Sequence, residues 1–208
     1  MPARTSRRTR TAEETRDVLL DAAAHLFRQH GYESTSLKAL GTQVGVSPSA
    51  MYWHFSSKSD LLFAVVERTL LRFRDRLVQE LAATDGTPRE RIRAFVRFYV
   101  HTQLNETVDV DAYTSFLATA HIADHLPAEA CRQLIGYERE IYALLRTAIE
   151  EGIASGEFGV DTPSSAAFAI VGMCENVQTW CRHGDADAVT TSEQYADYAL
   201  SIVRTSPA

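Results

Sequence analysis

Cysteine is scarce in this 208-residue chain, which contains only Cys131, Cys174 and Cys181. Three cysteines without a CxxC pair do not make the disulfide framework of a small secreted protein, so we expect a reducing, cytoplasmic location. No apolar run approaches the ~20 residues that span a bilayer. The basic N-terminus has no apolar stretch behind it. We therefore expect neither a membrane span nor a secretory signal.

The sequence also lacks the short motifs that mark common catalytic and nucleotide-binding sites. It has no G-x-S-x-G, no Walker A and no G-x-G-x-x-G sequence. His121 and His125 have a spacing that places two imidazoles on one helix face, but no further Cys or His clusters with them. We expect no enzyme activity, no metal and no cofactor.

Charge is distributed unevenly along the chain. The net charge of -6 argues, taken alone, against a protein that binds nucleic acid. Residues 1–58, however, carry a charge of +3, and the remaining residues carry -9. Two parts of opposite charge indicate two functions. Residues 1–10 are polar and rich in arginine, and we expect them to form a basic flexible arm.

Helical periodicity runs through almost the whole sequence, and an all-α fold of about nine helices is predicted. Thr11 with Glu14 three residues later predicts a capping box, and Gly31 is a plausible end of the helix that follows. The longer helices that we expect span residues 58–83, 88–104, 109–125, 127–156, 163–183 and 192–204. No segment is a convincing strand.

Residues 34–62 predict two short helices separated by a tight turn, which is the spacing of a helix-turn-helix motif. Apolar residues, Leu37 and Leu40 among them, pack the two helices together, and Gly45 permits the bend. The second helix begins at Ser47-Pro48, with serine as the cap and proline in the first turn. Its N-terminal end carries free N–H groups and the positive end of the helix dipole, both suited to phosphate.

The run G-V-S-P-S-A-M-Y-W-H-F-S-S-K-S-D-L-L, preceded by Thr35-Ser36-Leu37, resembles the N-terminal DNA-binding domain of the TetR-type (TetR/AcrR) transcriptional regulators. The resemblance covers residues 11–62, whereas the rest matches in length and helix content only. It implies a homodimeric repressor that binds double-stranded, palindromic operator DNA and is released by a small-molecule effector. We therefore expect an arm (1–10), a DNA-binding domain (11–57) and a ligand-binding and dimerisation domain (58–208).

The resemblance also assigns DNA contacts residue by residue. Pro48, Ser49 and Tyr52 align with positions that read or touch bases, Lys38 with one that can reach base or phosphate, and the second helix also presents Ser47 outward. Phosphate-contacting positions align with Ser36, Trp53, His54 and Lys58. Two alternatives stay open, because Trp53 also suits packing and His54 also suits a helix cap. Gly41 stands where alanine is usual, which costs the helix about 1 kcal/mol of propensity.

The C-terminal part is expected to supply the dimer surface and an effector cavity. The segment AAFAIVGMCENVQTWC is apolar or small nearly all round, so we expect it to be buried, either against a partner's helices or in the intramolecular core. The middle helices are expected to line a cavity, although most such residues are ordinary core. The candidate ligand-binding residues are Phe98, Tyr99, Thr102, Tyr113, Phe116, Leu117, Tyr137, Ile141, Met173, Val177 and Trp180.

Two classes of effector fit this part of the sequence. Trp180-Cys181-Arg182 resembles the end of a helix in regulators that sense acyl-CoA thioesters, and an arginine-lined mouth would meet the phosphates. The candidate arginines are Arg97, Arg139, Arg146 and Arg182. A neutral lipophile is the competing ligand. A rival interpretation from another class is an all-α carrier or enzyme that has kept an unused DNA-binding domain.

Overall fold

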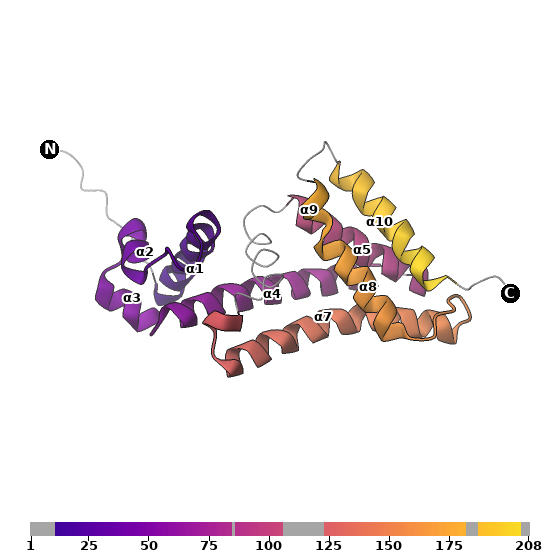
Figure 1. The fold of residues 1–208 in the computed structure, drawn as a ribbon, viewed down its shortest axis with the longest axis horizontal. Helices are drawn as coiled ribbons and strands as arrows, with labels where there is room; N and C mark the ends of the chain where they lie inside the picture. Colours follow the sequence, from indigo (N-terminus) through magenta and orange to yellow (C-terminus); the bar gives the residue numbers. More distant parts are fainter. Residues whose placement is uncertain (1–10, 85, 106–122, 182–186, 205–208) are drawn as a thin grey trace. The chain divides into compact units, whose positions relative to one another are not determined.

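The computed structural model describes residues 11–84, 86–105, 123–181 and 187–204 (Figure 1). Within these ranges all regular structure is helical, which confirms the all-α fold. The chain forms two compact units, Met1–Val65 (unit 1) and Val66–Ala208 (unit 2), and the boundary between them lies inside helix α4, Lys58–Ala82. In the described ranges no helix combines the length and the apolar character needed to cross a membrane.

Unit 1 contains α1 (Ala12–His30), α2 (Leu37–Val44), α3 (Pro48–His54) and the start of α4. The predicted capping box of α1 is present. Thr11 Oγ1 accepts a hydrogen bond from the Glu14 amide at 3.1 Å, and Glu14 Oε2 accepts one from the Thr11 amide at 2.8 Å. Gly31 ends α1 with a φ of 79°, a conformation that favours glycine.

The core of unit 1 comes from one face of each helix. α2 packs against α1 and against α3. The large apolar side chains that are almost fully buried include Leu19, Leu20, Phe27, Leu40, Met51, Phe55, Leu61 and Leu62. Burying a side chain of this size stabilises the fold by about 1.5–3 kcal/mol. The four helices α1, α2, α3 and the start of α4 thus share a core that none of them could form alone.

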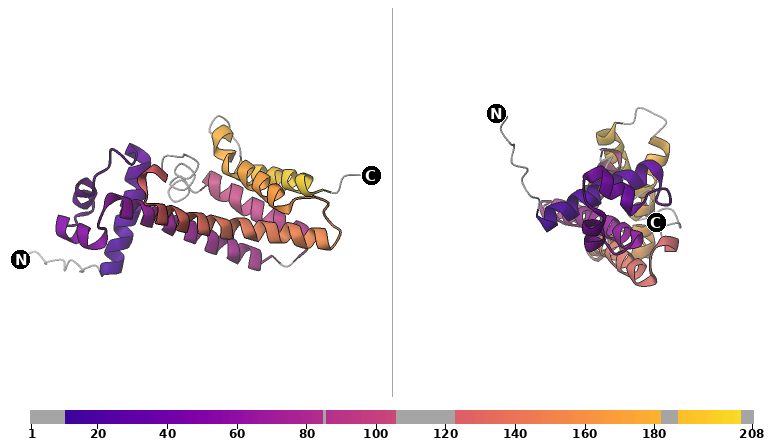
Figure 2. Two further views of the ribbon diagram at one scale, coloured as in Figure 1. Left: turned by 60° about the horizontal axis from the view of Figure 1, so that its bottom comes forward. Right: turned by 90° about the vertical axis from the view of Figure 1, so that its left-hand side faces the viewer.

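Unit 2 contains the rest of α4 together with α5 (Pro88–Asn105), η1 (Ala123–His125), α7 (Ala128–Ala154), α8 (Pro163–Glu175), α9 (Val177–Cys181) and α10 (Ala188–Val203). α5 lies beside α10, α7 and α8, as two views of the ribbon show (Figures 1 and 2). Two arginines of α5 strengthen its contact with α10: Arg93 lies 2.8 Å from Glu193 and 2.5 Å from Asp197, and Arg97 lies 2.8 Å from Glu193.

The prediction of one continuous helix over residues 163–183 is wrong, because the structure divides this segment into α8 and α9. Asn176 interrupts the helix, and its Nδ2 donates a hydrogen bond to the Gly172 carbonyl at 2.8 Å. A side chain that binds the carbonyl four residues earlier competes with the helical backbone. Within one chain this segment is not buried all round, since Phe168 is 61% exposed, and burial of that face against a partner's helices stays a prediction.

The start of the last helix is also corrected by the structure. α10 begins at Ala188 rather than at Ser192, because the Asp187 side chain accepts a hydrogen bond from the Thr190 amide at 2.8 Å and so caps the helix. Of the helix expected at 109–125, only Ala123–His125 falls in the described part of the chain, where it forms the short 3-10 helix η1.

Candidate nucleic-acid interface and effector-binding unit

The turn between α2 and α3 is closed by two glycines. Gly45 has the left-handed backbone conformation, with φ 71° and ψ 32°, and ends α2. The Val46 amide then donates to the Gly41 carbonyl at 2.8 Å. A Cβ added at Gly41 would lie 3.0 Å from the Val46 carbonyl oxygen. Gly41 therefore weakens α2 as a helix but leaves room for the chain to turn closely over it.

Helix α3 presents a polar and aromatic face to solvent. Ser47 caps it by accepting a hydrogen bond from the Ala50 amide at 3.3 Å, and Pro48 occupies the first turn, as predicted. Met51 anchors the helix in the core with 1% exposure. Tyr52 is 61% exposed and Trp53 72% exposed. Together with the exposed Ser47, Pro48 and Ser49, these side chains form what we call the α3 face.

Trp53 and His54 differ in their surroundings. Trp53 is too exposed to serve as core packing in unit 1, and its ring meets the His54 ring edge-on at 4.7 Å. His54 is half-buried at the end of α3. Burial lowers the pKa of His54, and the positive charge of Arg16 lowers it further. The neutral imidazole is thus favoured, which suits a hydrogen-bonding role better than a charged one.

The supporting helix α2 adds two exposed polar groups. Ser36 caps α2 by accepting a hydrogen bond from the Ala39 amide at 3.1 Å, so its hydroxyl hydrogen remains available to an acceptor. Lys38 is exposed in the first turn. Both therefore lie in solvent-accessible positions, as a contact with DNA requires.

Lys58 is placed differently from the other candidate DNA contacts. Its Nζ lies 4.1 Å from the centre of the Tyr32 ring and donates to the Glu33 carbonyl oxygen at 3.1 Å. The Glu33 carboxylate is 4.0 Å away, and the lysine side chain is 25% exposed. These contacts join the start of α4 to the loop between α1 and α2. Neither Tyr32 nor Glu33 was predicted as a partner of Lys58, because residues 26 and 25 positions away leave no local signal in the sequence.

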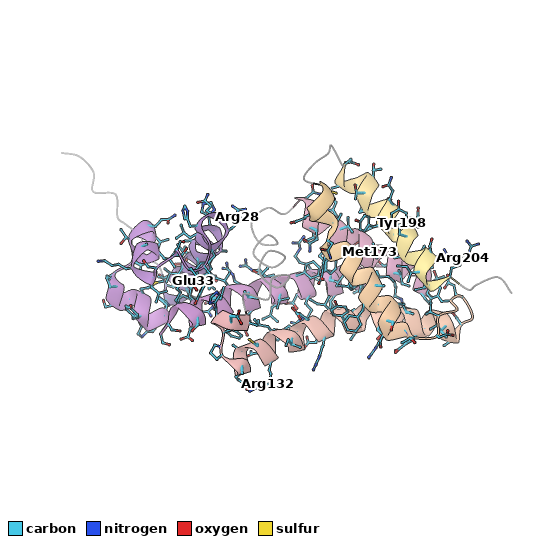
Figure 3. All side chains as sticks on the ribbon, in the orientation of Figure 1. Arg28, Glu33, Arg132, Met173, Tyr198 and Arg204 are labelled. Atoms are coloured by element: carbon cyan, nitrogen blue, oxygen red, sulfur yellow. The ribbon has the colours of Figure 1, made fainter. Side chains whose placement is uncertain are left out.

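The described candidate effector-binding residues lie inside unit 2 or at its edge. Tyr99, Thr102, Ile141 and Val177 are buried, whereas Phe98, Tyr137 and Met173 are half-buried. Met173 lies on α8, where Figure 3 labels it. Tyr113, Phe116 and Leu117 fall outside the described residues, as does the side chain of Trp180. The residues that can be placed come from α5, α7, α8 and α9.

Aromatic and hydrogen-bond contacts connect these residues to α4. The Phe73 ring of α4 lies 5.4 Å from the Phe98 ring and 4.8 Å from the Tyr99 ring. The Tyr137 hydroxyl donates to Glu67 Oε1, also on α4, at 3.1 Å. A change in the packing of α5 or α7 would therefore alter the contacts that these helices make with α4 within unit 2.

A half-buried pair of carboxylates lies among the same helices. The Tyr99 hydroxyl donates to Glu175 Oε1 at 3.3 Å. Burial raises the pKa of Glu175, and burial together with the charge of Glu175 raises the pKa of Glu138. Burial and both carboxylates raise the pKa of Tyr142 to about 12. The sequence pattern did not reveal this cluster, since its members lie on three helices.

Two of the hollows on the described part of unit 2 are large, and none of the candidate effector-binding residues that can be placed lines either of them. One, of about 490 Å³, is lined by Leu81, Ala82, Thr84, Gly86, Arg91, Phe95, Ala143, Leu144, Leu145, Thr147 and Ala148. The other, of about 480 Å³, is lined by Ile135, Glu138, Arg139, Tyr142, Ala143, Arg146, Ser164, Ala167 and Phe168. Of the arginines expected at a cavity mouth, Arg139 and Arg146 line the second hollow. Arg97 instead pairs with Glu193, and Arg182 is outside the described residues.

Comparison with known families gives matches to both parts of the chain. A family model described as "Bacterial regulatory proteins, tetR family" matches residues 19–65. A second, described as "Tetracyclin repressor-like, C-terminal domain", matches residues 85–203.

Curated relatives are similar over different lengths. The transcriptional regulator TtgR of Pseudomonas putida is 27% identical over 97% of this chain and 98% of its own. The transcriptional repressor NicS of Pseudomonas putida is 26% identical over 81% of this chain and 77% of its own. The regulator AcrR of Shigella flexneri is 34% identical, but the match spans only 44% of that protein and 46% of this chain.

Solved structures share the fold. A TetR/AcrR-family regulator from Thermobifida fusca has a TM-score of 0.72 and 30% identity, covering 92% of this chain and 100% of that one. FadR of Bacillus subtilis, solved with stearoyl-CoA, has a TM-score of 0.76 and 19% identity over 90% of this chain and 99% of its own. AibR, solved with isovaleryl coenzyme A and operator DNA, has a TM-score of 0.73 and 21% identity over 90% and 97%.

Proposed function

The chain belongs to the TetR family of bacterial regulatory proteins, and we propose that it is a repressor that binds a palindromic operator as a homodimer and is released by a small-molecule effector. The observation that carries the proposal is the α3 face. A short capped helix holds Met51 in the core and directs Ser49, Tyr52 and Trp53 to solvent. Large aromatic side chains this exposed have no role in the fold of unit 1, but they suit contact with a DNA groove.

In this proposal the α3 face enters the major groove. Pro48, Ser49 and Tyr52 contact base edges, while Ser47, Trp53 and His54 contact phosphates. Lys38 and Ser36 add contacts from α2. Lys58 contributes positive charge near the backbone while it holds the loop at Tyr32 in place. The arm of residues 1–10 adds electrostatic attraction without sequence preference.

The outer faces of α8 and α10 supply the proposed dimer surface. On α8, Phe168 is 61% exposed, and an added Cβ at Gly172 would meet nothing within 4 Å. On α10, Tyr198 is 57% and Ile202 37% exposed, and Figure 3 shows Tyr198 on this helix. Exposed apolar residues on two neighbouring helices mark an interaction surface. A symmetric dimer through these helices would bring two α3 faces to one operator.

The effector is proposed to bind in unit 2, among Phe98, Tyr99, Thr102, Tyr137, Ile141, Met173 and Val177. The residues at 113, 116, 117 and 180 remain part of the proposed lining. Two structures of the same fold, FadR and AibR, were solved with acyl-CoA thioesters, which supports an acyl-CoA or another lipophile as the effector. The contacts of Phe73 and Glu67 give α4 a means to respond.

The experiment is a binding measurement with duplexes that the wild-type protein selects from a random pool. We expect the selected sequence to have two-fold symmetry and to bind one dimer per duplex. The affinity should fall strongly as the salt concentration rises. A reporter gene placed behind that sequence should be expressed less when the protein is present. A selected pool without symmetry, or no enrichment at all, would refute the proposal.

The dimer surface has its own test. Tyr198→Glu should shift the full-length protein to monomer in sedimentation and lower operator affinity, because it places a charge on the proposed surface. Val78→Glu is the matched control, since Val78 is also apolar and 44% exposed but lies on α4. If the two variants changed the oligomeric state and the operator affinity equally, α10 would not be part of the interface.

A further inference from the structure

Arg16 is a charged residue on the face of α1 that supplies the core of unit 1. It precedes the buried Leu19 by three residues and the buried Ala23 by seven, so the helical period places all three side chains on one side of α1. Arg16 itself is exposed. The core does not need a cation at the solvent end of this face, so the contacts of Arg16 indicate its role.

The guanidinium group of Arg16 lies over the ring of Phe55, the residue that ends α3. Its Cζ is 5.5 Å from the ring centre, and Phe55 is 3% exposed. A guanidinium that stacks on an aromatic face keeps the N–H groups at its edge available as hydrogen-bond donors. Arg16 forms neither an ion pair nor a side-chain hydrogen bond with any residue of the described ranges. Its charge and its donors are therefore available to a ligand.

Arg16 also lies beside His54, the last residue of α3. Burial lowers the pKa of His54, and the nearby positive charge of Arg16 lowers it further. The His54 ring in turn meets the Trp53 ring edge-on at 4.7 Å. A cationic guanidinium and a neutral imidazole side by side offer an anion a positive charge and several donors without repelling each other.

A backbone phosphate of DNA is the anion that this position suits. The end of α3 adjoins the α3 face, and both belong to unit 1. A duplex whose major groove holds the α3 face carries closely spaced phosphates along both edges of that groove. One edge would then pass the end of α3, where Arg16 adds a charge to the contacts proposed above for Trp53 and His54.

We propose that Arg16 binds a backbone phosphate of the operator from α1, next to His54 and Trp53 at the end of α3. The inference rests on the proposed function, since it adds a contact to the same DNA-binding surface. The Phe55 ring holds the plane of the guanidinium, so the contact is preorganised. A phosphate contact fixes the position of the protein on the duplex but reads no base. Arg16 should therefore contribute to affinity without contributing to the choice of sequence.

The test is fluorescence anisotropy of full-length variants with the selected duplex and with a duplex of shuffled sequence, over a range of salt concentrations. Arg16→Met removes the charge but keeps an unbranched apolar side chain over Phe55. It should weaken the binding of both duplexes by a similar factor, roughly tenfold or more for a dimer, because each protomer loses a charge-assisted contact. The salt slope should fall by about 2, because two phosphate contacts are lost per dimer.

Two further variants separate the phosphate contact from other effects. Arg16→Lys keeps the charge but not the planar fork, so it should keep the salt slope and restore only part of the affinity. Arg28→Met is the matched control, because it removes the same charge from the same helix, about 18 Å along the axis from Arg16. Figure 3 labels Arg28, whose Nη2 lies 3.3 Å from His25 Nδ1. Urea unfolding of each variant gives the folded fraction by which the affinities are corrected.

The outcomes distinguish this contact from net charge and from packing. Equal losses of affinity and of salt slope in Arg16→Met and Arg28→Met would overturn the proposal, because net charge alone would explain them. A wild-type salt slope in Arg16→Met would also overturn it, since Arg16 would then only cover Phe55. If the wild-type protein selected no duplex, the regulator proposal would fail together with this one. If it selected a duplex and Arg16→Met bound that duplex like Arg28→Met, only the Arg16 contact would fail.

Discussion

Tyr52 and Met51 are neighbours on α3 with opposite surroundings, and together they separate DNA binding from folding. Tyr52 is 61% exposed and is expected to touch a base, whereas Met51 is 1% exposed and packs in the core of unit 1. Replacing each by alanine removes a large side chain from adjacent positions of the same helix. The two variants therefore differ in what the side chain contacts rather than in local sequence.

The expected magnitudes differ in both assays. Tyr52→Ala leaves no buried cavity, so the free energy of unfolding should change by no more than about 0.5 kcal/mol. Its loss of a base contact should cost about 1–3 kcal/mol per half-site, which over two half-sites is roughly 30-fold or more in operator affinity. Met51→Ala should lower the free energy of unfolding by about 2–5 kcal/mol, because it leaves a cavity in the core. Its operator affinity should fall only in proportion to the unfolded fraction.

The free energy of unfolding is measured by urea unfolding, monitored by circular dichroism. Operator affinity is measured by fluorescence anisotropy with the selected duplex at two salt concentrations. Tyr52→Ala should keep the wild-type salt dependence, since a base contact releases no counterion. The reasoning is refuted if Tyr52→Ala is as stable as wild type and binds the duplex with wild-type affinity. In that case the α3 face would not be the surface that reads DNA.

Three further predictions concern the turn, the carboxylate pair and the arm. Gly45→Ala should destabilise unit 1 by about 1 kcal/mol in urea unfolding, because alanine is disfavoured at a φ of 71°, and an unchanged midpoint would contradict this. Burial and the charge of Glu175 raise the pKa of Glu138 above its ordinary 4.5. Between the ordinary and the raised pKa, the folded state holds a proton that the unfolded chain releases. The free energy of unfolding therefore falls as the pH rises through this range. The difference in melting temperature between Glu138→Gln and wild type should therefore grow in favour of the variant from pH 4 to pH 8. A difference that stays constant over this range would count against the raised pKa. Deletion of residues 1–10 should weaken operator binding and reduce its salt slope without changing the selected sequence, whereas an unchanged slope would show that the arm does not contact phosphates.

The helix-turn-helix part of the fold was predictable because its signals are local. Thr11 with Glu14, Gly45, and Ser47 with Pro48 each act within four residues, and each is found where the sequence indicates. Helical periodicity does not predict the division of α8 from α9, because Asn176 fits the pattern of a continuous helix while its side chain binds the carbonyl of Gly172.

Contacts between distant residues were beyond the reach of such patterns. Lys58 carries a basic charge that suits a phosphate contact, and nothing nearby in the sequence indicates that Tyr32 and Glu33 already surround its ammonium group. The hollow of about 480 Å³ between α7 and α8 depends on where α8 crosses α7, which periodicity does not specify. Of its arginines, Arg139 and Arg146 were expected to meet phosphate, but the aromatic ring of Phe168 beside them was expected to be buried.

Helix α4 limits how an effector can act on the proposed operator contacts. Its residues 58–65 belong to unit 1 and the rest to unit 2. In the proposed mechanism, an effector would act on the operator contacts through this helix. Phe73 and Glu67 connect its unit 2 part to Tyr99 and Tyr137. Such an effector could shift the equilibrium only by its difference in affinity between the operator-binding state and the released state of the protein. Operator DNA must then weaken effector binding by the same factor by which the effector weakens operator binding.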